Sequence, residues 1–454
     1  MSGLAMVLAQ RGYSVSGSDT ADNIFIKKLK ALNVEIFNNQ KAININQITK
    51  NQTKDVLIIV SSAISEMNEE LQSAHKHKLK ILHRSDILSY LIREKKSILI
   101  AGSHGKTTTS TLITTLIAKN DYDPTLIIGG IVPIYQNNAY SGKGEFLIAE
   151  IDESDGSITK YNGDIAILTN IELDHTDHYQ DLSSLMESVN LFAKNSQLVI
   201  ANYDCPNLKE NLSSKAIWWS TKTFEEVEFA AIPIEINGIE TTAQYYEKGE
   251  LIDQINISLP GLHNFNNAIA AIAASRSAGL SFKEIKNGLT SLESPKRRFE
   301  FKGIWDNKVL IDDYAHHPTE IRETISMARL LMNSKKSLLP IKAKRLVIIF
   351  QPHRYSRLRD LMRGFASSLS KADLLLLAPI YSAGELPIKG INNEKLKELI
   401  LEKNPSLSIL NSKNIIDVKN LIKRKSQPHD LLLIMGAGDI TKLSKELLKD
   451  QLST

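Results

Sequence analysis

Cysteine is almost absent from this chain, because Cys205 is the only one among its 454 residues. A single thiol excludes an intrachain disulfide and is typical of a reducing compartment, so we expect a cytoplasmic protein in which Cys205 is a small, half-buried hydrophobic residue. No apolar run approaches ~20 residues, which predicts no membrane span. Residues 1–10 lack the basic leader and the small-residue cleavage site of a secretory signal.

A strong excess of charge of one sign is also missing. The chain has 55 Lys and Arg against 51 Asp and Glu, a net charge of +4, which over this length does not predict nucleic-acid binding. Hydrophobic residues make up 42% and charged residues 23%, so a sizeable core is available and wholesale disorder is excluded. At about 150 residues per domain, the length predicts about three domains.

Apolar runs alternate with helical patterns along most of the chain, which predicts an α/β fold with mostly parallel sheets. Polar, β-like patterning over residues 218–258 indicates a small antiparallel part, and domain boundaries are expected near 95 and 298. The first helix is expected at residues 1–10, and helices of interest at 107–119 and 265–278. Strands are expected at residues 13–19, 55–61, 81–82, 97–101, 146–151, 165–169, 198–201, 309–312, 345–350, 373–378 and 431–435.

The strongest local motif is AGSHGKTTTS at residues 101–110, placed between a buried strand and a helix. Glycines let backbone N–H groups curl around phosphate oxygens, and the helix N-terminus adds positive potential. In this interpretation Lys106 contacts the β- and γ-phosphates and the Thr107 hydroxyl contacts Mg²⁺. Ile100 replaces the first glycine of the full phosphate-loop pattern, so a structural turn is the alternative. The nucleotide-binding candidates here are Gly102, Ser103, His104, Gly105, Lys106, Thr107 and Thr108.

Two further strands are expected to end in polar clusters, AEIDESDGS at residues 149–157 and TNIELDH at 169–175. Four carboxylates at one strand end repel one another unless a cation is present, which makes Glu150 a candidate Mg²⁺ ligand. His175 is a candidate metal ligand or acid/base group. The alternatives are a solvated acidic loop and an ordinary surface histidine.

Later motifs add amide, arginine and histidine side chains. HNFNNA (263–268) offers Asn264 and Asn267 for a base or ribose, or for helix capping. RRFE (297–300) places Arg298 at a domain junction, where it contacts a phosphate or forms a surface charge pair. DDYAHHPTE (312–320) and FQPHRYSR (350–357) end strands of the last block and make a plausible carboxylate site.

Together with GAGDI (436–440), these motifs occur in the order and spacing of the Mur ligases, and the chain resembles that family over nearly its whole length. The resemblance implies three α/β domains. They are an N-terminal Rossmann-like UDP-sugar domain (1–95), a central P-loop ATPase-like domain (96–298) and a C-terminal Rossmann-like amino-acid domain (299–454).

The resemblance also implies a reaction. ATP phosphorylates the lactyl carboxylate of UDP-N-acetylmuramate, and the amine of L-alanine attacks the acyl phosphate to form the first peptide bond of the peptidoglycan stem. ATP and Mg²⁺ are the implied cofactors, and the protein is expected to be a monomer or a homodimer. The alternative within the family is a ligase that attaches a recycled murein peptide to the same sugar nucleotide. A third possibility is a non-catalytic nucleotide-binding regulator.

Site residues follow from the same resemblance, position by position. Lys106 and Thr107 match the phosphate-loop lysine and the Mg²⁺-binding hydroxyl, Glu150 and His175 the two metal-site residues, and Arg298 the junction arginine. Asn264 and Asn267 match the pair near the ATP base and ribose, and Asp313 the aspartate that reaches ATP. His316 or His317, with Arg354 and Arg357, matches the alanine side. The amine needs a base, for which His175 and a metal-bound oxygen are both candidates.

One departure concerns the start of the chain. Family members begin with a strand and a Gly-rich loop ahead of the segment that matches residues 1–5, and both are missing here. A start codon assigned too late is the expected reason, with poor sugar-nucleotide binding as the alternative. The rest of the UDP site is expected from Asp19, Ser62 and Arg84.

Overall fold

The computed structural model describes residues 1–21, 23–50, 55–174 and 178–452. By its internal contacts the chain forms two compact units. Unit 1 comprises Met1–Glu172, Ser183–Ile217 and Ala271–Glu284, and unit 2 comprises Leu173–Leu182, Trp218–Ala270 and Ile285–Thr454. Within the described ranges, every helix is too short or too polar to cross a bilayer.

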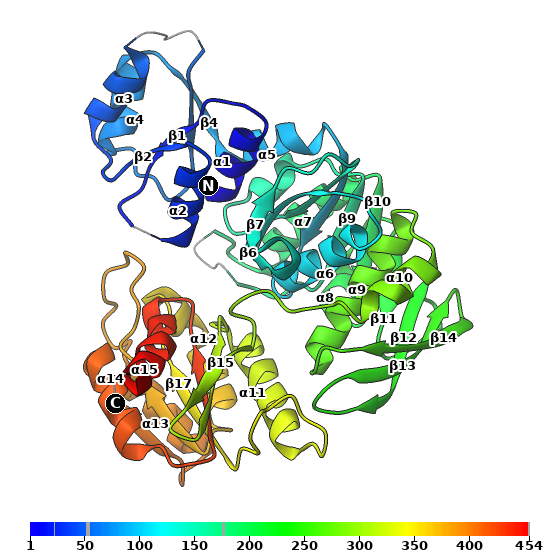
Figure 1. Cartoon of the computed structure of the whole chain (residues 1–454), viewed down its shortest axis with the longest axis vertical. Coiled ribbons are helices and arrows are strands. Elements are labelled where there is room, and N and C mark those ends of the chain that lie inside the picture. Colours follow the sequence, from blue (N-terminus) through cyan, green and yellow to red (C-terminus); the bar gives the residue numbers. More distant parts are fainter. Residues whose placement is uncertain (22, 51–54, 175–177, 453–454) are drawn as a thin grey trace. The chain divides into compact units, whose positions relative to one another are not determined.

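The first part of unit 1 alternates short helices and strands (Figure 1). Its strands form two parallel pairs, β1 with β2 and β3 with β4. Ile45, Ala74 and Leu79 form a small core beside the second pair. The elements are α1 (Ser2–Gln10), β1 (Ser16–Ser18), α2 (Ile24–Ala31), β2 (Glu35–Phe37), α3 (Ala42–Thr49), β3 (Leu57–Val60), α4 (Glu69–Lys76), β4 (Lys80–His83) and α5 (Arg84–Ile92).

The rest of unit 1 is built on strands in the order β10-β9-β5-β8-β6-β7. All neighbours are parallel except β7, which pairs antiparallel with β6. The central strand β5 (Lys96–Ala101) is buried at every position after its first, as expected of a strand covered on both faces. Its other elements are α6 (Lys106–Ala118), β6 (Thr125–Val132), η1 (Pro133–Tyr135), β7 (Asn137–Tyr140), β8 (Phe146–Glu150), η2 (Ser157–Lys160), β9 (Ile165–Leu168), α7 (Leu182–Lys194), β10 (Leu198–Asn202) and α8 (Pro206–Asn211).

This strand order brings three loops with charged and polar side chains to the same edge of the sheet. Parallel strands end at the same edge of a sheet, and β5 lies between β8 and β9. The loops that follow these three strands carry the AGSHGKTTTS, AEIDESDGS and TNIELDH motifs. Ligands of open α/β sheets bind at this edge, so the sheet topology itself defines the candidate site.

Unit 2 contains strands of two sheets, the β11–β14 end of a ten-stranded sheet and a six-stranded sheet. In the first, β11 pairs parallel with β12, and β12, β13 and β14 form an antiparallel meander, which confirms the antiparallel part expected over residues 218–258. The chain then forms two helices, α9 and α10. The first part of α9 belongs to unit 2, and the first part of α10 belongs to unit 1. These elements are β11 (Ile217–Ser220), β12 (Phe229–Ile236), β13 (Thr241–Glu247), β14 (Glu250–Ile257), α9 (Leu262–Ser277) and α10 (Phe282–Leu289).

The second sheet of unit 2 has the order β15-β16-β20-β17-β18-β19, parallel except for the edge strand β15. One apolar cluster joins it to α11, α12 and α13, and a second joins it to α14 and α15, so helices cover both faces. The elements are β15 (Glu300–Trp305), β16 (Lys308–Asp313), α11 (Pro318–Asn333), β17 (Arg345–Phe350), α12 (Tyr355–Leu369), β18 (Leu374–Leu377), α13 (Asn393–Lys403), β19 (Ser408–Asn411), α14 (Ile415–Lys425), β20 (Asp430–Met435), η3 (Asp439–Thr441) and α15 (Lys442–Leu452).

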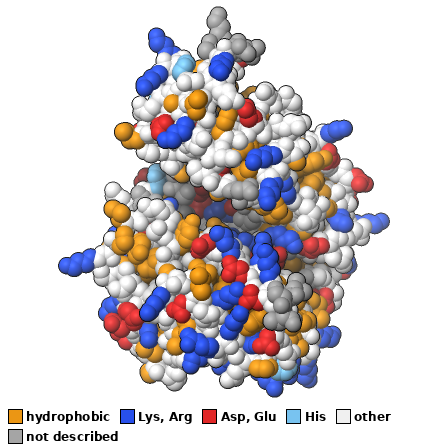
Figure 2. Space-filling model, turned by 60° about the vertical axis from the view of Figure 1, so that its left-hand side comes forward, with side chains coloured by type: hydrophobic (Ala, Val, Ile, Leu, Met, Phe, Trp, Pro, Cys, Tyr) orange, Lys and Arg blue, Asp and Glu red, His pale blue; other side chains and the backbone are white. Residues whose placement is uncertain are grey.

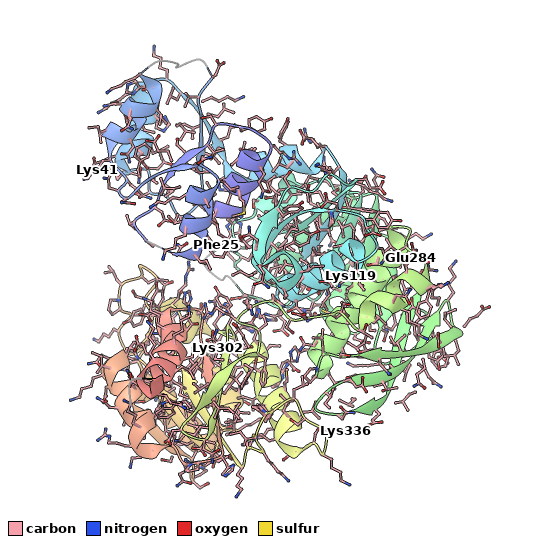
Figure 3. All side chains as sticks on the ribbon, viewed as in Figure 1. Phe25, Lys41, Lys119, Glu284, Lys302 and Lys336 are labelled. Atoms are coloured by element: carbon pink, nitrogen blue, oxygen red, sulfur yellow. The ribbon has the colours of Figure 1, made fainter. Side chains whose placement is uncertain are left out.

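Figure 2 shows the charged side chains on one face of the molecule. On the face shown in Figure 2, acidic and basic side chains are interspersed and hydrophobic side chains occur in small groups. The basic segment after α11 is an exposed loop around Lys336, labelled in Figure 3. Cys205 is buried rather than half-buried, and its sulfur accepts a hydrogen bond from the Ile171 N–H at 3.4 Å.

Candidate active site

Hydrogen bonds to the residues that follow β9 hold the loop between β5 and α6 in its shape. The His104 N–H donates to Asn170 Oδ1 at 3.0 Å, and the Thr169 hydroxyl and the Asn170 amide donate to the His104 carbonyl at 2.7 and 2.9 Å. Gly102 and Gly105 have φ of +130° and +83°, values that favour glycine. The backbone therefore turns sharply into the N-terminus of α6, which is the geometry that receives phosphate.

Gly102→Ala is expected to destabilise the fold by about 2–4 kcal/mol, from strain at positive φ plus overpacking. A Cβ at this position would meet the Thr169 hydroxyl and would lie 2.7 Å from the Asn170 carbonyl oxygen. Denaturant unfolding measures the change. Gly17→Ala, where nothing lies within 4 Å of the added atom, is the matched control and should change stability little. Equal effects of the two variants would contradict the tight approach at Gly102.

Glu150, the last residue of β8, faces the start of α6. Its two carboxylate oxygens accept from the Thr107 hydroxyl at 3.0 and 2.9 Å, and Oε2 also accepts from the Gly129 N–H at 2.8 Å. A Cβ on Gly129 would lie 2.9 Å from Glu150 Oε2, so only glycine leaves this carboxylate its space. The Thr107 hydroxyl and the Glu150 carboxylate lie side by side, and hard oxygen donors of this kind fit Mg²⁺.

Lys106, the first residue of α6, is paired with Glu153. Its Nζ lies 3.0 Å from both Glu153 oxygens and also donates to the carbonyls of Gly102 and Ser103. Burial alone would lower the pKa of Lys106, but the charges of Glu153 and Glu150 raise it above its usual value. Lys106 is therefore a fixed positive charge at the loop.

Two residues predicted for the sugar-nucleotide side, Arg84 and Ser62, meet at the same acidic segment. Arg84 Nη2 lies 3.1 Å from Asp152 and 2.9 Å from Asp155, and the Ser62 hydroxyl donates to Asp155 at 2.7 Å. Burial opposes ionisation of Asp155, but hydrogen bonds from Ser157 and Ser62 and the charge of Arg84 hold its pKa well below the usual value. The Asp19 carboxylate accepts a hydrogen bond from the Ala21 N–H at 2.9 Å.

The next predictions concern the third loop, which follows β9. Ser103 exchanges hydrogen bonds with the backbone of Glu172, at 2.8 and 2.9 Å, which ties the loop between β5 and α6 to the TNIELDH motif. His104 Nε2 lies 3.4 Å from a Glu172 carboxylate oxygen. His175, the predicted second metal ligand, lies outside the described residues.

In unit 2, Asp313 ends β16 and is buried. Its carboxylate accepts from the N–H groups of Phe299 and Ala315, both at 2.7 Å, and burial raises its pKa. It thereby fixes the junction segment that carries Arg298. The Arg298 guanidinium lies over the Tyr314 ring, 5.3 Å from its centre, with Nη1 3.4 Å from Glu320.

The histidines predicted for the alanine side have different surroundings. His316 Nδ1 donates to the Tyr314 carbonyl at 3.0 Å, so Nε2 of the neutral ring is its acceptor. Its ring centre lies 5.9 Å from that of His353. His317 is buried at the N-cap of α11, where its side chain accepts from the Thr319 N–H.

The two arginines of FQPHRYSR also differ. Arg357 is buried and pairs with Asp174 at 3.2 Å, whereas Arg354, with φ of +68°, is more exposed and lies 3.9 Å from Glu385. His316, His353 and Arg357 thus come from the two predicted motifs of the last block, at the carboxyl edge shared by β16, β20 and β17.

Acid is expected to destabilise the protein through three partly buried histidines. Burial lowers the pKa values of His263, His316 and His353 to about 4 each. An unfolded chain protonates histidine below about 6.5, so between pH 6.5 and 4 it binds more protons than the native state, and the free energy of unfolding falls as pH falls. For the partly buried His316 ring, whose side chain is 17% exposed, this amounts to about 1–2 kcal/mol at pH 5.

Denaturant unfolding at pH 7 and pH 5 measures the effect. His316→Asn should reduce the pH dependence, whereas the exposed His75→Asn should leave it unchanged. A dependence that is identical in His316→Asn and in the unmodified protein would contradict the lowered pKa of His316.

Asn264 and Asn267 are buried inside the first turns of α9, not at its cap. The Asn264 amide donates to the Pro260 carbonyl at 2.9 Å and lies 3.7 Å from the Met327 sulfur. Helix capping, the alternative left open by the sequence, is therefore not how Asn264 is used.

Sequence reasoning missed the partners of the predicted cations. Glu153 pairs with Lys106, Asp174 with Arg357 and Glu320 with Arg298. All three acids lie inside motifs that the sequence singled out. Their carboxylates could have been found as buried counter-charges, but which acid meets which base depends on the tertiary structure.

Three family models match the chain in succession. The catalytic domain of the Mur ligase family matches residues 1–96, the Mur ligase middle domain residues 100–275, and the Mur ligase glutamate ligase domain residues 297–438. These matches define the class of the protein: the chain belongs to the Mur ligase family. The loop after β5 and the polar side chains that follow β8 and β9 agree with that class.

Among its curated relatives are proteins named UDP-N-acetylmuramate–L-alanine ligase. One from a strain of Prochlorococcus marinus is 59% identical, covering 99% of this chain and 95% of the relative. Another from a strain of Synechococcus is 46% identical over 98% of this chain and 95% of the relative.

Solved structures share the fold. The UDP-N-acetylmuramate-alanine ligase of Thermotoga maritima superposes with a TM-score of 0.82 at 24% identity, covering 100% of this chain and 96% of that chain. A murein peptide ligase from Psychrobacter arcticus gives a TM-score of 0.72 at 22% identity, covering 99% and 96%. These likenesses confirm the α/β fold class expected from the sequence.

Proposed function

We propose that this protein joins L-alanine to the lactyl carboxylate of UDP-N-acetylmuramate at the expense of ATP, as an enzyme of peptidoglycan precursor synthesis. The observation that carries the proposal is its similarity, at 59% identity over 99% of the chain, to a ligase of that name. The geometry of the β5, β8 and β9 strand ends supports it, since a phosphate-type loop lies beside an oxygen-donor pair.

In this proposal, two anions must meet: the sugar-borne carboxylate and the terminal phosphoryl group of ATP. Lys106 and the N-terminus of α6 stabilise the charge on the transferred phosphoryl group, and Arg298 adds a second cation. Thr107, Glu150 and His175 would hold Mg²⁺, which when bound offsets charge on the phosphates. The carboxylate attacks the terminal phosphorus, ADP leaves, and the acyl phosphate forms.

The alanine amine then attacks the acyl carbon, and phosphate leaves. Arg354 and Arg357 are proposed to contact the carboxylate of alanine, and His316 or His317 to lie beside its amine. Asn264, Asn267 and Asp313 are assigned to the nucleoside end of ATP. Residues 102–108 form the phosphate cradle, and Asp19, Ser62 and Arg84 are assigned to the sugar nucleotide.

The proposed organisation has a UDP-sugar domain over residues 1–95, an ATP domain over 96–298 and an amino-acid domain over 299–454. We place the reaction in the cytoplasm, where ATP and sugar nucleotides are available, and in a monomer or a homodimer.

Phosphate release with each of the three substrates omitted in turn tests the proposal. Release is expected only when ATP, UDP-N-acetylmuramate and L-alanine are all present, with a product heavier by one alanyl residue. A murein tripeptide replaces L-alanine in a parallel reaction. Turnover with the tripeptide but not with L-alanine would overturn the proposal in favour of murein-peptide ligation. ATP binding without turnover would indicate a regulator.

A further inference from the structure

One short acidic segment contacts two cationic side chains, which the proposed function assigns to two different substrates. The acidic loop, defined as residues 152–155, follows β8. Glu153 contacts Lys106 at 3.0 Å through both oxygens, whereas Asp152 and Asp155 contact Arg84 at 3.1 and 2.9 Å. Lys106 is assigned to the terminal phosphate of ATP and Arg84 to the sugar nucleotide.

The Lys106–Glu153 and Arg84–Asp155 pairs are largely shielded from water, whereas the Asp152 side chain is 43% exposed. The side chain of Glu153 is 3% exposed and that of Lys106 14%, and the side chains of Asp155 and Arg84 are 15% and 23% exposed. Exposed pairs contribute little because water screens them, but a carboxylate that loses its partner in a buried site is costly. An incoming anion must therefore compete with the acidic loop for each cation.

Hydrogen bonds within the acidic loop join its residues to one another. The Ser154 N–H donates to Asp152 Oδ1 at 3.0 Å, the Gly156 N–H to the Glu153 carbonyl at 3.0 Å, and the Ser157 N–H to Asp155 Oδ1 at 3.1 Å. With these turns closed on themselves, a shift of Glu153 away from Lys106 also shifts its neighbours, which hold Arg84. The converse holds when Arg84 is released first.

We propose that the acidic loop is a shared internal anion, which occupies the cations for both anionic substrates, so that either substrate displaces it and tightens binding of the other. The inference rests on the proposed function, because it uses the assignment of Lys106 to ATP and of Arg84 to the sugar nucleotide. By linkage, the tightening is the same in both directions.

If the acidic loop had only a structural role, removing one of its negative charges would have the opposite effect on ligand binding. If the carboxylates only hold the site in shape, removing a charge loosens the site and weakens both ligands. If they compete with the ligands, removing a charge strengthens binding of the free ligand. Glu153→Gln and Asp155→Asn keep size and a hydrogen-bond acceptor while removing the charge, so they separate the two cases.

Isothermal titration of the full chain with Mg²⁺ present provides the test. The dissociation constants of a non-hydrolysable ATP analogue and of UDP-N-acetylmuramate are measured alone and with the other ligand saturating. In the unmodified protein each ligand is expected to tighten the other about 5–50-fold. Glu153→Gln should tighten the ATP analogue alone by about fivefold or more, and Asp155→Asn should do the same for UDP-N-acetylmuramate. In both variants the mutual tightening should shrink towards onefold.

Glu145→Gln is the matched control, since Glu145 is exposed just before β8, at the opposite end of the same strand. It should leave both constants and their coupling unchanged. Binding of both ligands with independent affinities, or weaker binding in Glu153→Gln and Asp155→Asn, would overturn the inference while leaving the proposed function intact. Failure of the unmodified protein to bind the ATP analogue would instead overturn the proposed function and this inference together, and failure to bind UDP-N-acetylmuramate alone would overturn the inference.

Discussion

Lys106→Ala is expected to lower alanine-dependent phosphate release by about 10³-fold or more. Lys106 is the cation at the N-terminus of α6 and is held in the loop by two carbonyl groups and Glu153. A preorganised charge aimed at a transferring phosphoryl group stabilises the transition state more than the ground state. Initial-rate measurements with all three substrates saturating give the effect on kcat.

Lys119→Ala is the matched control for that loss. Lys119 is exposed just beyond the C-terminal end of the same helix and is labelled in Figure 3, and its loss should leave the rate unchanged. Because Lys106→Ala leaves the buried Glu153 carboxylate without its cation, the double variant Lys106→Ala/Glu153→Ala is needed as a companion. It should regain stability but not activity. Recovery of activity in the double variant would contradict a direct role for Lys106.

Glu150→Gln is expected to lower the rate by about 10²–10³-fold and to raise the Mg²⁺ concentration needed for half-maximal rate. The amide retains an oxygen that can accept from Thr107 and from the Gly129 N–H, so the local fold should survive. What it removes is the negative charge that makes this oxygen pair a ligand for a hard cation. The rate is measured over a Mg²⁺ titration.

The Glu145→Gln control, with the same change of charge just before the same strand, should show the Mg²⁺ dependence of the unmodified protein. An unchanged Mg²⁺ requirement in Glu150→Gln would contradict the assignment of Glu150 to the metal. The free energy of unfolding of the variant, measured alongside, separates loss of the fold from loss of the site.

The elements that the sequence predicted best are those dictated by local pattern. The strand at 345–350 was predicted with the bounds that the structure shows, and the helix after the phosphate loop within one residue. Long apolar runs between polar loops leave few alternatives for a strand buried on both faces. That Lys106, Thr107 and Glu150 lie close together was also predictable, because neighbouring parallel strands end at the same edge of a sheet.

Other elements were missed because their signals are weak or non-local. The strand Thr125–Val132 contains two consecutive glycines, which are poor strand formers, and Glu300–Trp305 is an edge strand with several exposed residues. The sequence showed that four clustered carboxylates need cations, but not that Glu153 takes Lys106 while Asp152 and Asp155 take Arg84. That division depends on where α5 and α6 lie in the folded unit.

The most direct test of the account is to follow oxygen from the sugar-borne acid. UDP-N-acetylmuramate labelled with ¹⁸O in both lactyl carboxylate oxygens is turned over with ATP and L-alanine, and the released phosphate is analysed by mass spectrometry. Activation by phosphorylation predicts one ¹⁸O in each phosphate, because the oxygen that attacks phosphorus leaves with it. Phosphate free of ¹⁸O would mean that the carboxylate is never phosphorylated, and would contradict the central claim.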